Sequence, residues 1–304
     1  MGGLMLLDTP SLYFRAFFGV PESVTASDGT PVNAIRGLLD MIARLVRERS
    51  PHSVVACMDA DWRPRFRVDA LPSYKAHRVG PDGGDQTPPA LGAQVPLIEQ
   101  VLEAYGIAQV GAAGYEADDV IGTLATTEDG EVDIVTGDRD LFQLVRDDKP
   151  VRVLYTARGI KALQVMGEAE VTAKYGIPGR AYADFATLRG DPSDGLPGVP
   201  GIGDKTAAAL ITKFGSLEGI TEALDSGETS GFPAGSRLKL EKAHDYLGAA
   251  EMVVRVVTDI PLGDIDARLP RTPREPERLV ELTDRWNLDG PVNRLLGALR
   301  TVDG

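Results

Sequence analysis

Short apolar runs alternate with amphipathic stretches through the first half of the chain. Four of the runs have the length and the continuous apolar character of buried strands: 4–7, 53–58, 132–135 and 151–154. Between them, apolar residues recur at helical spacing over 33–48, 95–105 and 117–124. This alternation is typical of a mostly parallel central sheet flanked by helices, so the predicted fold class is α/β.

The second half of the chain, from about residue 168, has mostly helical spacing and is interrupted by turns rich in glycine and proline, such as 195–201. We therefore expect a core domain over 1–183 and a helical region over 184–304 that packs on it. Within the core, residues 79–90 are rich in glycine and proline and predict a mobile loop.

The composition is that of an ordinary globular protein, with 43% hydrophobic and 25% charged residues. No run approaches the roughly 18 apolar residues of a membrane-spanning helix, and the N-terminus lacks a secretory signal. The single cysteine, Cys57, excludes an intrachain disulfide and a cysteine-rich zinc site. These features predict a protein of the reducing cytoplasm.

The formal net charge is −13, from 32 basic and 45 acidic residues, which argues against a general nucleic-acid coating protein. A binding site is local, however, so the placement of the acids matters more than their number. Asp8, Asp59 and Asp138 stand at the ends of three predicted strands. Because ligands of open parallel sheets bind outside the carboxyl ends of the strands, we expect these carboxylates at one edge, with Asp140 beside Asp138.

Two further acidic groups have local explanations as well as functional ones. Glu116, Asp118 and Asp119 open a predicted helix, where acids are favoured by the helix dipole without any metal. Asp191 and Asp194 enter a glycine- and proline-rich loop, and such a pair is typical of a turn or a helix cap. Either group alone leaves both readings open.

Taken together, the acids point to a metal site. The set has nine members: Asp8, Asp59, Glu116, Asp118, Asp119, Asp138, Asp140, Asp191 and Asp194. Repulsion in a partly buried cluster of this size requires cations, and hard oxygen ligands suit Mg²⁺ or Mn²⁺. Two such ions roughly 4 Å apart stabilise the attacking and the leaving oxygen in phosphodiester cleavage. The sequence therefore predicts a metal-dependent phosphodiesterase without a side-chain nucleophile.

A basic stretch over 62–80 contrasts with the acidity of the whole chain. It contains five cations and one acid, Asp69, with the cations at Arg63, Arg65, Arg67, Lys75 and Arg78. Lys75 and Arg78 are three residues apart and are suited to holding a scissile phosphate above the metals. The other arginines are candidates for DNA contacts, and Tyr74 for stacking on a base. The alternative is a solvated basic loop.

A glycine-rich turn precedes a predicted helix over about 204–214. Gly198, Gly201 and Gly203 allow a tight turn, and the backbone N–H groups at the helix start form an anion site with Lys205 and Thr206. Such a site suits a DNA phosphate and carries no sequence preference. This pattern occurs in many DNA repair proteins, so it indicates contact with the DNA backbone more than a nuclease.

The chain resembles the structure-specific 5′ nucleases, in particular the 5′-nuclease domains of bacterial DNA polymerase I, over about residues 4–300. The motifs that carry the resemblance follow in this order: Leu-Leu-Asp8, Met-Asp59, Tyr74-Lys-x-x-Arg78, Gly-Tyr-Glu116-Ala-Asp118-Asp119, Thr-Gly-Asp138-Arg-Asp140, Gly-Asp191-Pro-Ser-Asp194 and Leu-Pro-Gly-Val-Pro-Gly-Ile-Gly.

The resemblance implies a PIN-like core, a helical arch at about 62–95 and a C-terminal helix–hairpin–helix element that grips duplex DNA and holds a K⁺ ion. It implies 5′-3′ exonuclease and 5′-flap endonuclease activity on DNA with 5′ ends, flaps or gaps, by a monomer. It assigns Asp8, Asp59, Glu116 and Asp118 to a first metal. It assigns Asp138, Asp140, Asp191 and Asp194 to a second, with Asp119 nearby. Lys75 and Arg78 match the cations at the base of the arch.

Two alternatives remain beside this hypothesis. One is a branch-binding DNA repair module with little catalysis, which would need the glycine-rich turn but not the acids. The other is a ribonuclease of the related PIN type, which is usually shorter and lacks the helix–hairpin–helix. Because no polymerase region follows in the 304 residues, we expect a free-standing nuclease.

Overall fold

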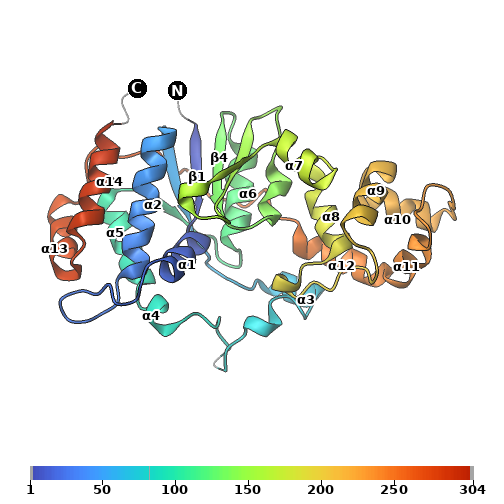
Figure 1. Ribbon diagram of the computed structural model, residues 1–304, viewed down its shortest axis with the longest axis horizontal. Helices are drawn as coiled ribbons and strands as arrows, with labels where there is room; N and C mark the ends of the chain where they lie inside the picture. Colours follow the sequence, from blue (N-terminus) through green and yellow to red (C-terminus); the bar gives the residue numbers. More distant parts are fainter. Residues whose placement is uncertain (1–2, 82, 302–304) are drawn as a thin grey trace.

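A six-stranded sheet forms the centre of the computed structural model, which describes residues 3–81 and 83–301 (Figure 1). Its order is β3-β2-β1-β4-β5-β6, and all neighbours are parallel except β5 and β6. The strands are β1 (Leu4–Asp8), β2 (Ser53–Cys57), β3 (Ala108–Val110), β4 (Val132–Thr136), β5 (Val151–Tyr155) and β6 (Gln164–Met166). The predicted α/β class is confirmed. Strands β3 and β6 have three residues each, too few to show a periodicity.

The register of the sheet brings the ends of three strands level. Asp8 is paired with Cys57 of β2, and Leu7 with Val135 of β4. The chain therefore leaves β1, β2 and β4 at the same edge, and the aspartates that follow them start from neighbouring positions. This is the arrangement predicted from the sequence for parallel strands.

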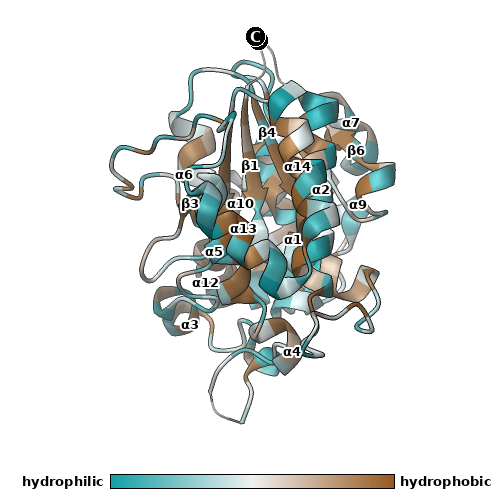
Figure 2. Ribbon diagram, turned by 90° about the vertical axis from the view of Figure 1, so that its left-hand side faces the viewer, coloured by the Kyte–Doolittle hydropathy of each residue, from teal (hydrophilic) through white to brown (hydrophobic). Residues whose placement is uncertain are grey.

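Helices cover both faces of the sheet (Figure 1). Met5 and Leu7 of β1 face a core shared with the first group of helices: α1 (Thr9–Gly19), α2 (Asn33–Arg49), α5 (Val95–Tyr105), α13 (Pro276–Trp286) and α14 (Asp289–Thr301). Leu4 and Leu6 face the opposite core, with the second group: α6 (Ala117–Thr127), α7 (Glu168–Tyr175) and α8 (Tyr182–Arg189). Figure 2 shows brown strands behind helices whose outer turns are largely teal.

Beyond α8 the chain builds a helical extension at one end of the molecule (Figure 1). Its helices are α9 (Asp204–Phe214), α10 (Leu217–Asp225), α11 (Ser236–Lys242) and α12 (His244–Val254). The chain then returns to the sheet, where α14 packs along α2 on the far side. The region expected over 184–304 thus contains two separate groups of helices.

The predicted arch segment lies beneath the carboxyl edge of the sheet (Figure 1). It contains three short helical pieces, α3 (Arg65–Ala70), a 3-10 turn at Ala76–Arg78 and α4 (Pro89–Gly92), joined by non-helical chain. A continuous helical arch is therefore not formed within its described residues, as the glycines and prolines of this segment explain. Asp82, in the predicted loop 79–90, lies outside the described residues.

In the described ranges, 3–81 and 83–301, no helix combines the length and the apolar character needed to cross a bilayer.

Candidate active site

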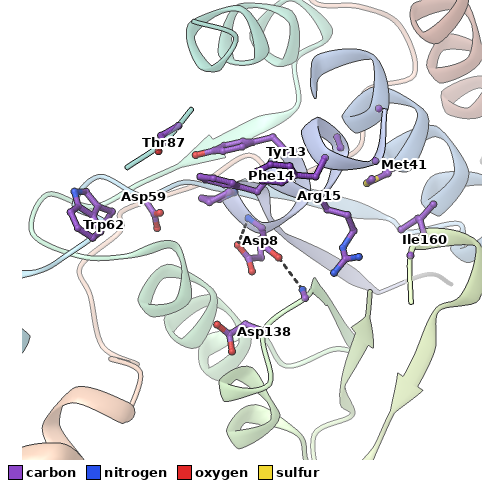
Figure 3. Close-up of a pocket in the computed structure, with 18 of the residues that line it drawn as sticks. Asp8, Tyr13, Phe14, Arg15, Met41, Asp59, Trp62, Thr87, Asp138 and Ile160 are labelled. Carbon is purple, nitrogen blue, oxygen red and sulfur yellow. Dashed lines mark hydrogen bonds between the residues drawn. The ribbon is translucent and has the colours of Figure 1, made fainter. Parts of the chain in front are cut away.

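A groove with a volume of about 1690 Å³ opens at the carboxyl edge of the sheet. Its lining includes five of the nine predicted metal ligands: Asp8, Asp59, Glu116, Asp118 and Asp138. Lys75 and Arg78 line it from the arch segment. Figure 3 shows Asp8, Asp59 and Asp138 pointing toward a common space from separate elements. Acids up to 130 positions apart in the chain are thus brought together, as the strand pattern predicts.

Asp8 sits at the centre of this edge and is almost fully buried. One carboxylate oxygen accepts from the backbone N–H of Ser11 (3.2 Å) at the start of α1, and the other from the Thr136 hydroxyl (2.5 Å). Burial raises the pKa of Asp8 to about 7, and repulsion from Asp59 and Asp138 acts in the same direction. The carboxyl is therefore held in place but is costly to ionise.

The neighbouring acids share this cost. Asp59 keeps an exposed edge and accepts from the Ala117 N–H (2.8 Å), yet the groove walls desolvate its carboxyl and raise its pKa. Desolvation, followed by repulsion from Asp8 and Asp138, raises the pKa of Asp118 well above its usual range. Several groups are thus disfavoured as anions by the same enclosed space.

Asp140, Asp191 and Asp194 adjoin this group through Asp138 rather than lining the groove themselves. Burial raises the pKa of Asp140 well above its usual range and that of Asp194 to about 6, and Asp138 repels both. Asp138 accepts from the backbone N–H of Asp140 (2.8 Å). Asp191 is paired with Arg139 (3.2 Å) and Arg189 (3.4 Å) and caps its own turn, as the alternative reading of this pair expected.

The residues present fit a hard divalent cation. The donors are carboxylate oxygens, and the Asp140 Oδ1 atom is buried without a hydrogen-bond partner among the residues that the structure describes. Within 3–81 and 83–301, no three histidine, cysteine or acidic side chains are already arranged as ligands of one ion. Coordination would therefore draw the acids closer together, against a repulsion that the cation itself offsets.

Two expectations change because of Arg67. Its guanidinium is buried and forms ion pairs with Glu116 (2.6 Å) and Asp119 (2.6 Å), so a contact with DNA is incompatible with its position. Asp119 is fully buried, and its oxygens also accept from the backbone N–H groups of Glu116 and Val257. Asp119 caps and anchors α6 and has no free oxygen for a metal. Two buried carboxylates require a buried cation, which Arg67 supplies.

Tyr74 also differs from expectation, because its ring is buried and its hydroxyl donates to Glu116 (2.8 Å) rather than facing a base. Arg63 donates to the backbone carbonyls of Tyr74 (2.6 Å) and Pro72 (2.9 Å), and so shapes the segment before Lys75. Arg65, whose side chain is 91% exposed, is the one of the three predicted DNA-contacting arginines that reaches solvent freely.

The two predicted catalytic cations both lie in the groove. The Lys75 ammonium forms an ion pair with Glu116. Arg78 pairs with Asp85 (3.0 Å) and lies over the Trp62 ring. Asp85 was not expected from the sequence, since it belongs to the glycine-rich loop. Arg15 was missed as well: it lines the groove from α1, two helical turns after Asp8, and this spacing was the available signal (Figure 3).

The glycine-rich turn leads into α9 as predicted. Gly198 has a φ of +67°, and a Cβ there would lie 2.3 Å from the carbonyl oxygen of Arg189, so the turn requires glycine. Gly203 precedes α9 without a side-chain cap, and Gly203 and Lys205 are exposed, while Thr206 is half-buried. The Gly201 carbonyl accepts from Lys239 of α11 (2.9 Å). An open helix start beside the exposed Lys205 is suited to binding an anion.

Comparison with protein families identifies the family of this chain. Residues 3–176 match the 5'-3' exonuclease N-terminal resolvase-like domain, and residues 177–277 match the 5'-3' exonuclease C-terminal SAM fold. The chain belongs to the 5'-3' exonuclease family. The resemblance stated from the motifs is thereby confirmed, and the boundary between the two matched parts falls before α8.

Relatives of this family member include free-standing and polymerase-linked proteins. A 5'-3' exonuclease of Streptomyces coelicolor is 58% identical over 301 residues, covering 97% of this chain and 99% of that protein. One of Mycobacterium tuberculosis is 50% identical over 315 residues, covering 99% of each. DNA polymerase I of the latter organism is 37% identical over 305 residues, which cover 99% of this chain and 32% of the polymerase.

Among solved structures, the T5 D15 protein co-crystallized with metal ions has the same fold, with a TM-score of 0.63. It is 18% identical, and the match covers 98% of this chain and 99% of that one.

The raised pKa values predict that this family member, kept free of metal, loses stability as pH rises. Asp8 and Asp194 hold protons up to about pH 7 and about pH 6 when folded, whereas the ordinary pKa of an aspartate is 3.8. Between about pH 4 and 7 the folded state therefore binds more protons, and the free energy of unfolding falls by about 1.4 kcal/mol per pH unit for each carboxyl that is protonated only in the folded state.

Urea unfolding in EDTA at several pH values measures this decline. The Asp8→Asn variant is the control, since it removes one of these titrations and should make the decline shallower. A wild-type free energy of unfolding that stays constant or increases from pH 4 to 7 would contradict the assignment.

Proposed function

We propose that this family member is a divalent-metal-dependent 5'-3' exonuclease and 5′-flap endonuclease that hydrolyses DNA phosphodiesters. The observation that carries the proposal is the groove in which five of the predicted metal ligands, from four places in the chain, face Lys75 and Arg78. The relatives that share half or more of its residues are 5'-3' exonucleases by name. A T5 D15 flap endonuclease structure in complex with DNA and metal ions has the same fold.

The acids divide by position into two sets of ligands. Asp8, Asp59, Glu116 and Asp118 line the groove and would hold the first ion. Asp138 would link them to a second set, with Asp140, Asp194 and, if its arginine pairs loosen, Asp191. Mg²⁺ or Mn²⁺ at these positions supplies an activated water and neutralises the charge that develops on the leaving oxygen. Asp119 stays with Arg67 as an anchor.

The cations of the groove complete the site. Lys75 and Arg78 face the acids and are placed to hold the scissile phosphate, whose charge grows as the bond breaks. No side-chain nucleophile is required, because the pocket acids serve to bind ions that activate water. A branch-binding module without catalysis would have no use for carboxyls that are so costly to ionise.

Duplex DNA would be gripped at the glycine-rich turn. The uncapped start of α9, with Lys205 exposed beside it, offers backbone N–H groups and a positive helix end to a phosphate. The Gly201 carbonyl already accepts from Lys239, so a K⁺ ion at this hairpin would share that carbonyl with an ammonium group. We propose that the protein binds 5′ ends, flaps and gaps in this way as a monomer.

Replacing Asp138 tests the metal assignment. The Asp138→Ala variant should cleave a 5′-labelled flap substrate about a thousandfold more slowly in Mg²⁺ or Mn²⁺, because the link between the two sets of ligands is lost. Its affinity for the same DNA in Ca²⁺ should stay within about threefold of wild type. Asp129→Ala, an exposed acid paired with Lys149, is the matched control and should cleave normally. Cleavage by Asp138→Ala at the wild-type rate would refute the assignment.

Replacing Lys205 tests the DNA grip. Each phosphate contact contributes about 0.9 to the slope of log affinity against log salt, so Lys205→Ala should weaken binding and reduce that slope by about one contact. Lys149→Ala is the control, since Lys149 is paired with Asp129 away from the groove and the turn. Fluorescence anisotropy over a range of salt concentrations gives both values. Unchanged affinity and slope in Lys205→Ala would exclude this contact.

A further inference from the structure

Glu116 is the most heavily engaged carboxylate of the groove. It accepts from the Arg67 guanidinium (2.6 Å) and the Tyr74 hydroxyl (2.8 Å), and it pairs with the Lys75 ammonium. Arg67 and Tyr74 approach from buried positions, whereas Lys75 lies on the groove side. The groove-facing side of this predicted metal ligand is therefore already occupied by a cation of the protein.

Lys75 is held in this position through its backbone as well as its side chain. Its backbone N–H donates to the carbonyl of Asp194 (2.9 Å), and its φ of +46° is unusual for a residue other than glycine. Two residues earlier, the Ser73 hydroxyl donates to the carbonyl of Gly195 (2.9 Å). The turn that carries Asp194 thus fixes the backbone from which the ammonium reaches Glu116.

The charge of Lys75 acts on more than one acid. Burial raises the pKa values of Asp59, Asp118 and Asp194, and the Lys75 ammonium counteracts this in all three. Arg67 is committed to Asp119 behind Glu116 and does not line the groove. Arg78 also lowers the pKa of Asp59, but its guanidinium is paired with Asp85. Lys75, directly paired with Glu116, thus acts on several of the predicted ligands at once, as a divalent ion would.

We propose that Lys75 is the resident counter-ion of the metal site, and that its ammonium must leave Glu116 before this carboxylate can hold a divalent cation. The inference rests on the proposed function, in which Glu116 is a metal ligand. Once released, the ammonium remains in the groove on its fixed backbone, where a DNA phosphate can accept it. Lys75 therefore opposes cation binding in the absence of DNA, and a bound phosphate removes that opposition. By linkage, the divalent cation and DNA each strengthen binding of the other.

Mn²⁺ binding to the full chain without DNA tests this competition. The free Mn²⁺ signal in electron paramagnetic resonance gives the dissociation constant. Lys75→Met, which removes the charge and keeps a similar length, should bind Mn²⁺ about tenfold more tightly, equivalent to about 1.4 kcal/mol. Lys75→Arg, which keeps the charge, should bind as wild type does. Lys75→Gln provides a second neutral side chain if methionine disturbs folding.

Arg78→Met is the matched control, because it removes a groove cation that is paired with Asp85 instead of Glu116. Its Mn²⁺ affinity should remain within about threefold of wild type. Equal or weaker Mn²⁺ binding by both neutral Lys75 variants would overturn the inference, as would an equal gain in Arg78→Met. If wild type and every variant fail to bind Mn²⁺, the proposed metal function itself fails. Mn²⁺ binding without the Lys75 effect refutes the inference alone.

Discussion

Repulsion among carboxylates that the fold forces into one space is the constraint on which this structure depends. The repulsion on each acid is compensated in a different way. Asp119 is neutralised by Arg67, and Asp191 by two arginines, whereas Glu116 shares Arg67 with a neighbour and takes Lys75 as well. Asp8 has hydrogen bonds but no ion-pair partner in the described part of the chain, and burial raises its pKa to about 7. Apart from Glu116, the predicted metal ligands that line the groove form no ion pair with a cation among the described residues, which is what a site for an external cation requires.

The sheet makes this crowding unavoidable. Its parallel register levels the ends of β1, β2 and β4, and α6 begins at the same edge, so acids at these four points converge whatever their separation in sequence. The turn after α8 adds Asp191 and Asp194 from a more distant part of the chain. That turn also holds the Lys75 backbone, so one loop supports both an acid group and the cation that faces it. A structural change at the acid group of this loop therefore affects the position of Lys75, and a change at Lys75 affects the acid group.

The sequence was sufficient for features that depend on local pattern. Strand ends, helix starts and the glycine turn were all readable, and with them the positions of the groove acids. It was insufficient where burial decides the role. Arg65 and Arg67 look alike in a basic stretch, but Arg65 is exposed, whereas Arg67 is buried and donates to the Val253 carbonyl of α12 (2.9 Å). The buried Arg67 in turn forms an ion pair with Asp119. The contact between Lys239 and Gly201 joins residues of different helices and leaves no sequence signal.

Anomalous diffraction from crystals grown with Mn²⁺ tests the central claim most directly, because it locates the ions and the side chains together. The account predicts manganese peaks between the groove acids, including one near Asp8 and Glu116, with the Lys75 ammonium displaced from Glu116. A groove without a manganese peak at saturating Mn²⁺, with Lys75 still paired to Glu116, would contradict it.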